Sequence, residues 1–238
     1  MRRYTLIPSG VSPGEYGDAA NVPVVAVDAM GRIRRISEAA IAPAGSGSGG
    51  STGAEFTAPP AASGFSWDNQ GSAALTDANG GLLFTVPANG GTSIRVAYKS
   101  APATPYKIET AFFLNAPGVD YLRAGLAFRQ SSDGKIVYHA LGYSGKYGYF
   151  GYKFTNATGF SGTYNDAGWL PVGGLWWLRI GDSGTNRTVE LSADGWNWLE
   201  IHSVSRTDFL TADQIGLCVD SNNATYGVKA QFMHWKQL

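Results

Sequence analysis

The sequence predicts an all-β protein in which a short N-terminal β-hairpin precedes an antiparallel β-sandwich. From residue 65 onward, short apolar runs recur at regular intervals, and turn-forming pairs such as Asn79-Gly80 and Asp133-Gly134 separate them. The 238 residues are 13% aromatic and include 32 Gly, a composition that favours short strands and many turns. The sequence contains no convincing amphipathic helix.

The charge balance limits the kinds of partner. Lys and Arg total 18 and Asp and Glu total 18, so the formal net charge is zero and nucleic acid is not expected as the main partner. No apolar run has the length of a membrane span, and no signal-peptide segment follows Arg2 and Arg3, so neither membrane insertion nor Sec export is expected. The single cysteine, Cys218, lies in an apolar run and is expected to be a core residue.

Residues 1–43 are expected to form a unit of their own. Two strands are predicted at residues 22–28 and 32–36, joined by a turn at residues 29–31. Their apolar side chains are too few to bury a core, so this unit must pack on a partner. Residues 44–64, rich in Gly, Ser and Pro, are predicted to be a flexible linker, and residues 65–238 form the sandwich.

The first unit also carries a recognisable pattern. The sequence Gly-Val-Ser-Pro-Gly-Glu-Tyr-Gly at residues 10–17, followed by Val-Pro-Val-Val-Ala-Val-Asp-Ala-Met-Gly-Arg-Ile at residues 22–33, resembles a segment of bacteriophage fibre proteins. Glu15 stands where threonine is usual, which changes one turn side chain. The resemblance implies a virion structural protein, a head fibre or capsid decoration or a short tail fibre. The residues that it assigns to the virion anchor are Tyr16, Val24, Val25, Val27, Asp28, Arg32 and Ile33.

The same resemblance implies partners and a location. The chain is expected to be a homotrimer, attached to a phage capsid or tail protein through its N-terminal segment. It is expected in the virion, after synthesis in the host cytoplasm. Whether the attachment is to the capsid or to the tail stays open.

The sandwich strands follow one another closely. The segment 175–201 is predicted to be a meander of three strands, with Trp196 and Trp198 on one face of the last strand. The predicted strands cover residues 65–67, 82–86, 93–98, 106–114, 122–129, 135–143, 147–154, 175–180, 188–192, 196–201, 214–220 and 228–235.

Several of these segments together resemble the concanavalin A-like jelly roll. The resemblance is carried by Leu-Arg-Ala-Gly-Leu-Ala-Phe-Arg at residues 122–129, by the Ser-Ser-Asp-Gly turn at residues 131–134 and by the closing Phe-Met-His-Trp at residues 232–235. It covers nearly all of residues 65–238 and implies two packed antiparallel sheets.

Enzymatic chemistry is not expected. Glycosidases on this fold place paired carboxylates on one strand, commonly as Glu-x-Asp-x-Glu, and that string is absent. Glu109, Glu190 and Glu200 each stand alone on a predicted strand, and the simplest expectation is that each faces solvent and pairs with Lys or Arg. A cross-strand pair of Glu109 and Glu190 would make a polysaccharide-degrading enzyme of the concanavalin A-like fold, which is kept as the alternative.

No cofactor and no metal ion are expected. His139, His202 and His234 lie on different predicted strands, without the spacing of a zinc site. The run Asp220-Ser221-Asn222-Asn223 carries oxygen ligands, but such residues in a turn usually hydrogen-bond the backbone.

A run of tyrosines at residues 142–154 suggests glycan binding. Tyr147, Tyr149 and Tyr152 are predicted near one face of a strand, with glycines between them that leave the rings accessible for stacking on sugars. The alternative is that these rings line the core or a subunit interface. The expected function is adhesion to a host-surface glycan, and the candidate site residues are Tyr143, Tyr147, Tyr149, Tyr152, Trp169, Asn165, Asp166 and Asn223.

Overall fold

The structure, a computed structural model, describes residues 11–40 except 13, 19, 30 and 31, and residues 61–238 except 116–118, 169–173 and 224. The chain divides into two compact units, Met1–Thr52 and Gly53–Leu238. Most of the predicted linker lies outside the described residues, and its far end forms the short 3-10 helix Ala62–Gly64. In the part of the chain that the structure describes, no helix has the length and apolarity of a membrane span.

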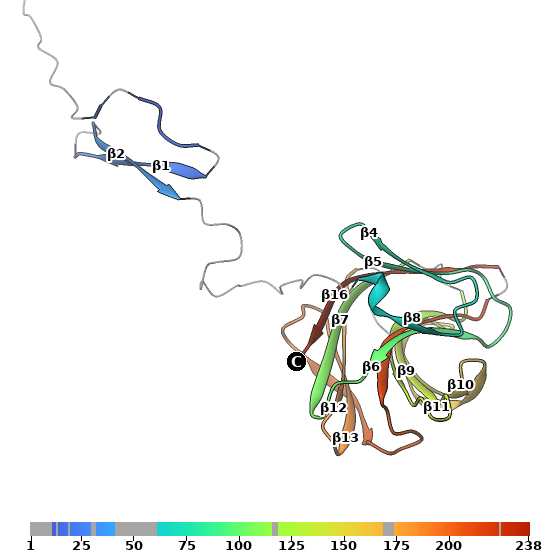
Figure 1. The fold of residues 1–238 in the computed structure, drawn as a ribbon. Coiled ribbons are helices and arrows are strands. Elements are labelled where there is room, and N and C mark those ends of the chain that lie inside the picture. The colour runs from blue at the N-terminus through green and yellow to red at the C-terminus, as the bar shows by residue number, and fades with distance from the viewer. Residues whose placement is uncertain are drawn as a thin grey trace, which may run out of the picture. The chain divides into compact units, whose positions relative to one another are not determined.

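The N-terminal unit contains the predicted hairpin. Strands β1 (Asn21–Val27) and β2 (Ile33–Ala40) pair antiparallel, with a register shift between Ala26 and Val27 (Figure 1). At the turn, the carboxylate of Asp28 accepts hydrogen bonds from Arg32 Nε at 2.8 Å and Arg34 Nε at 3.0 Å. The two strands leave aliphatic side chains exposed on both faces of the ribbon, namely Val22, Val24, Val25, Val27 and Ile33.

The second unit is a sandwich of two seven-stranded antiparallel sheets (Figure 1). In spatial order, the first sheet consists of β11 (Gly159–Gly168), β10 (Tyr147–Asn156), β9 (Ile136–Tyr143), β8 (Leu122–Arg129), β15 (Gln214–Ser221), β6 (Ile94–Ser100) and β3 (Ser66–Asp68). The second sheet consists of β14 (Leu199–Ser205), β13 (Asn186–Ser192), β12 (Trp176–Asp182), β7 (Tyr106–Asn115), β16 (Val228–Gln237), β5 (Gly81–Val86) and β4 (Ala74–Ala78).

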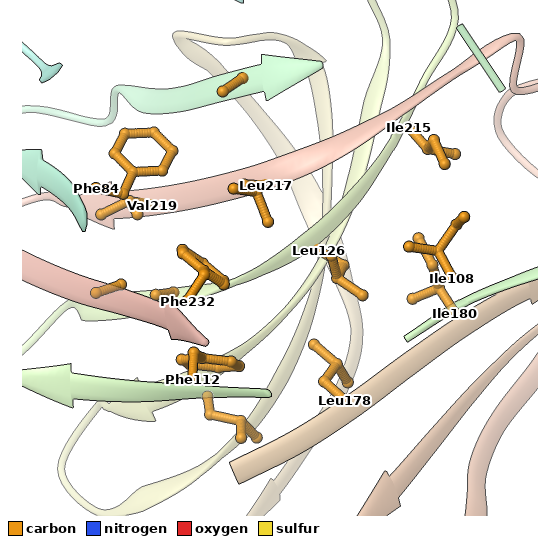
Figure 2. Packing of buried hydrophobic residues seen from close by; sticks show 14 of the residues in the cluster. Phe84, Ile108, Phe112, Leu126, Leu178, Ile180, Ile215, Leu217, Val219 and Phe232 are labelled. Atoms are coloured by element: carbon orange, nitrogen blue, oxygen red, sulfur yellow. The ribbon is translucent and has the colours of Figure 1, made fainter. Parts of the chain in front are cut away.

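The main core lies between the two sheets. Leu126 and Leu217 of the first sheet and Leu178 and Phe232 of the second are almost fully buried in one cluster (Figure 2). The rings of Phe112 and Phe232, on neighbouring strands, lie with centroids 5.1 Å apart. The predicted antiparallel sandwich of jelly-roll type is therefore confirmed, and alternate residues of each strand fill its core.

The outward face of the first sheet is buried as well. Its side chains form a second apolar cluster that includes Tyr138 and Phe150, at 1% and 0% exposure, although the described residues contain no further layer over them. Strands β8 to β11 of this sheet follow a bent path (Figure 1). The backbones of the neighbouring strands β8 and β9 leave no room for a side chain at Gly125, whose Cβ would lie 2.1 Å from the carbonyl oxygen of His139.

Two strands were not predicted, and one strand begins later than predicted. β4 and β11 lie in segments with weak apolar alternation. The expectation that Trp196 and Trp198 occupy a strand is wrong, because β14 begins at Leu199. The carboxylate of Asp194 accepts backbone N–H bonds from Trp196 and Asn197, both at 2.8 Å, and this turn holds the segment out of the sheet.

Candidate functional site

A cavity of about 290 Å³ opens on the curved face of the first sheet. Four strands build it. Arg123 comes from β8, Asp220 from β15, Tyr152 from β10 and Phe160 from β11, and the pairing order of these strands brings the four side chains together. The volume is near the lower end of the range for small-molecule sites, so the cavity has room for a single small ring.

An ion pair forms the floor of the cavity. Arg123 Nη1 lies 3.1 Å from Asp220 Oδ2, and the two side chains are 3% and 7% exposed. The hydroxyl of Tyr138 donates to the same carboxylate oxygen at 2.9 Å, and the backbone N–H of Asn222 donates to Asp220 Oδ1 at 3.2 Å. These contacts fix the plane of the carboxylate and, through it, the guanidinium.

Part of the Arg123 guanidinium has no partner in the protein. Nη1 donates to Asp220 and to the hydroxyl of Tyr138, and Nη2 donates to the hydroxyl of Tyr152 at 3.3 Å. Nε is buried and has no hydrogen-bond partner. An N–H group that is buried without a partner destabilises the fold by about 1–3 kcal/mol, so this donor is suited to an oxygen of a ligand.

Aromatic rings make the walls and the rim. The guanidinium carbon of Arg123 lies 4.5 Å from the ring centre of Phe150, 4.7 Å from that of Tyr152 and 5.0 Å from that of Tyr121. Tyr121 and Phe160 are about half exposed at the opening. Phe160 packs edge-on against Tyr152, with ring centres 5.6 Å apart.

Burial dominates the electrostatics of the floor. It raises the pKa of the Asp220 carboxyl, while the Arg123 guanidinium and the Tyr138 hydroxyl counteract that rise. Burial also raises the pKa of the Tyr152 hydroxyl, against the neighbouring Arg123. The hydroxyl of Tyr152 therefore stays protonated at neutral pH and is available as a hydrogen-bond donor or acceptor.

Of the tyrosines predicted to bind a glycan, only Tyr152 lines this cavity. The expectation that Tyr149 shares an accessible face with Tyr152 is wrong, because residues three apart in a strand point to opposite faces. Tyr149 is 2% exposed in the core between the sheets, where its hydroxyl lies 2.6 Å from His139 Nδ1. Tyr143 and Tyr147 pack against each other at the β9–β10 turn, with ring centres 5.0 Å apart.

The predicted polar partners lie beside the cavity and do not line it. Asn165 and Asp166 are on β11, and Asp166 lies 3.6 Å from Lys146 Nζ. Asn223 donates from Nδ2 to the carbonyl oxygen of Asp120 at 2.7 Å and accepts backbone N–H bonds in its own turn. Trp169 lies outside the described residues.

Sequence reasoning missed Arg123, Tyr121 and Phe160, and it considered Asp220 only as a turn residue, whereas Asp220 lies in β15. Two of them carry a pattern that could have been used: Arg123 interrupts the otherwise apolar start of β8, and Asp220 closes the apolar run of β15. A charged residue within a buried strand requires a partner, which predicts that Arg and Asp of this kind meet.

The glutamates considered for catalysis lie on the other sheet. Arg179 bridges them, with Nη2 2.5 Å from Glu109 Oε2 and Nη1 2.8 Å from Glu190 Oε2, and Lys107 lies 2.6 Å from Glu190 Oε1. The ring of Trp198 covers the Arg179 guanidinium at 3.6 Å. Burial raises the pKa of both carboxyls, but the hydrogen bonds that they accept from Arg179 and Lys107, and that Glu109 accepts from His234, outweigh it, so the pKa of both is lowered.

That arrangement is an ion-pair network, as expected, but Glu109 and Glu190 are buried, at 6% and 9% exposure, whereas solvent-facing positions were expected. Glu190 pairs with two cations and Glu109 with one, and a carboxylate held ionised in this way is unsuited to donate a proton. In the residues that the structure describes, no group of three or more His, Cys, Asp or Glu side chains could hold a metal ion.

Comparison with known proteins shows the fold and no family. No protein-family model and no curated protein matches the chain. A functionally unknown protein from Saccharomyces cerevisiae is similar over 75% of this chain and 98% of its own, with 13% identity and a TM-score of 0.50. The GH43 protein BlXynB from Bacillus licheniformis is similar over 72% of this chain, with 13% identity and a TM-score of 0.55.

A third solved structure, GH43B of the xyloglucan PUL of Bacteroides ovatus, has 19% identity and a TM-score of 0.52 over 75% of this chain. The chain spans only 36% and 35% of the two GH43 proteins, so it corresponds to one part of each. At these identities the likeness concerns architecture, and it agrees with a jelly-roll sandwich of the concanavalin A-like type.

Proposed function

We propose that the jelly-roll unit binds carbohydrate, and that the cavity around Arg123 is its site. The observation that carries this proposal is the combination of a buried Arg123–Asp220 pair at the floor with the half-exposed rings of Tyr121 and Phe160 at the opening. Sugar rings present C–H groups that stack on aromatic faces, and their hydroxyls hydrogen-bond charged side chains. The similar GH43 proteins add support by analogy only.

The test is binding of the full chain to a printed array of glycans, with two variants that differ only in position. Phe160→Ala removes a rim ring, whereas Phe113→Ala removes a ring of similar exposure, 45% against 53%, from the second sheet. The proposal expects saturable binding that Phe160→Ala weakens and Phe113→Ala leaves unchanged. Binding that survives Phe160→Ala at full strength would place the site elsewhere.

We further propose that the hairpin attaches the protein to a virion, as the resemblance to bacteriophage fibre proteins implies. Supporting this, the ribbon exposes Val22 and Val24 on one face and Val25 and Val27 on the other, and among the described residues of the unit no strand pairs with either edge. A two-stranded ribbon of this kind is marginally stable alone, so association of copies into a homotrimer would bury it.

The homotrimer that this proposal includes is tested first, by measuring the mass of the full chain in solution. Light scattering of the full chain is expected to give a trimer mass, and Val25→Asp is expected to reduce it to the monomer. Ser132→Asp, at an exposed turn of the second unit, is a control of equal charge outside the ribbon. A monomeric wild type would refute the trimer. Retention of labelled protein on bacterial cells and on purified virions then separates adhesion from decoration.

The alternative is a polysaccharide-degrading enzyme. Among the described residues that line the cavity, Asp220 supplies the only carboxylate, whereas glycoside hydrolysis by the usual routes employs two. This observation favours binding without hydrolysis. Release of reducing ends from the glycans that score on the array would establish the enzyme instead.

A further inference from the structure

We propose that the cavity selects a sugar that carries a carboxylate, a uronic acid residue being the simplest such ligand, and that Arg123 binds that carboxylate. This inference rests on the proposed carbohydrate binding and specifies its chemistry. It starts from the hydrogen bonds that Arg123 makes and from those that it leaves unmade.

The first step is the number of free donors. Nη1 uses its two N–H groups on Asp220 and Tyr138, and Nη2 uses one of its two on Tyr152. Nε is buried and has no partner, so Nε–H and one Nη2–H are left without an acceptor among the described residues. Two N–H groups of one planar guanidinium match the two oxygens of a carboxylate, whereas a single sugar hydroxyl oxygen occupies only one of them well.

The second step is that the guanidinium is held in place before a ligand arrives. It lies between the rings of Phe150, Tyr152 and Tyr121, at 4.5–5.0 Å, and Asp220 fixes its far edge. At 3% exposure its donors work in a site of low water content, where a charge-assisted hydrogen bond is stronger than at the surface. Little side-chain freedom is lost when a ligand binds.

The third step concerns Asp220, whose negative charge would repel an acidic ligand if it stood free. Its Oδ2 already accepts from Arg123 and Tyr138, and its Oδ1 accepts from the backbone N–H of Asn222. These donors face the carboxylate from three sides and offset its charge. The half-exposed rings of Tyr121 and Phe160 then remain to contact the sugar ring.

The experiment compares matched pairs of ligands on the full chain by titration calorimetry. The probes are methyl β-D-glucuronide against methyl β-D-glucoside, and methyl α-D-galacturonide against methyl α-D-galactoside. At least tenfold tighter binding of one acidic member over its neutral counterpart is expected. Because this comparison uses the unaltered protein, it does not depend on whether a variant folds.

Two variants then locate the selectivity. Arg123→Lys keeps the positive charge and removes the planar pair of donors, and it is expected to lose most of the preference for the acidic member. Arg129→Lys is the control, because Arg129 lies on the same strand and also pairs with an aspartate, Asp68 at 2.6 Å, but does not line the cavity. It is expected to keep the preference.

The outcomes separate the two proposals. Equal binding of the acidic and neutral members would overturn the carboxylate inference and leave carbohydrate binding standing. Binding of the acidic member that Arg123→Lys leaves unchanged would also overturn it. If no member of either pair binds and the glycan array is blank, the proposed function itself fails.

Discussion

Acidification from pH 7.5 to 5.0 should destabilise the jelly-roll unit, and His139 should account for much of the loss. This side chain is 2% exposed between the sheets. Burial holds the pKa of His139 well below its usual 6.5, and the neighbouring His202 and Arg187 lower it further. Its ring lies parallel to that of Tyr149 and 5.5 Å from that of His202.

The sign follows from proton linkage. The folded state keeps His139 neutral, whereas the unfolded chain protonates it below pH 6.5, so stability is complete above that value and falls as the pH drops below it. Over the span from 6.5 to 5.0, at about 1.4 kcal/mol per pH unit, the loss is about 2 kcal/mol. For a unit of this size that corresponds to a fall in Tm of about 4–8 °C.

The measurement is thermal or urea unfolding followed by tryptophan fluorescence, because all 7 Trp residues lie in the second unit. His139→Gln is the variant, since an amide keeps a polar group near the hydroxyl of Tyr149 and does not titrate. The variant should be less stable at pH 7.5 and should lose about 2 kcal/mol less than the wild type between pH 7.5 and 5.0. Identical losses in the two proteins would refute the reasoning.

Three further predictions concern packing and turns. Gly125→Ala should destabilise the sandwich by more than about 3 kcal/mol in urea unfolding, because its Cβ would meet backbone at 2.1 Å, whereas Gly91→Ala, with open space around it, should be neutral. Arg179→Met should cost about 3 kcal/mol by the same measurement, since two largely buried carboxylates lose their shared partner; a neutral result would show that they are well solvated. Asp194→Ala should free the turn that positions Trp198, seen as a change in tryptophan emission at pH 7; an unchanged spectrum would contradict this role for the turn.

The sequence alone was enough to predict the class of fold and most of its strands. The alternation of residues and the glycine-bearing turns are local properties, and they correctly placed strands such as β8 and β12 and the N-terminal hairpin. It also indicated that Glu109 and Glu190 would pair with cations, but it placed them at solvent-facing positions, whereas both are buried.

The site was decided by tertiary structure. A strand has two faces, and alternation does not say which one points inward when both are apolar, so Tyr149 and Tyr152 could not be assigned. That the outward face of the first sheet holds a buried cluster of its own is also visible only in the folded chain. Only the pairing of β15 with β8 brings Asp220 to Arg123, 97 positions away in the chain. Local sequence determines which residues form strands, whereas long-range pairing and sheet curvature determine which side chains meet.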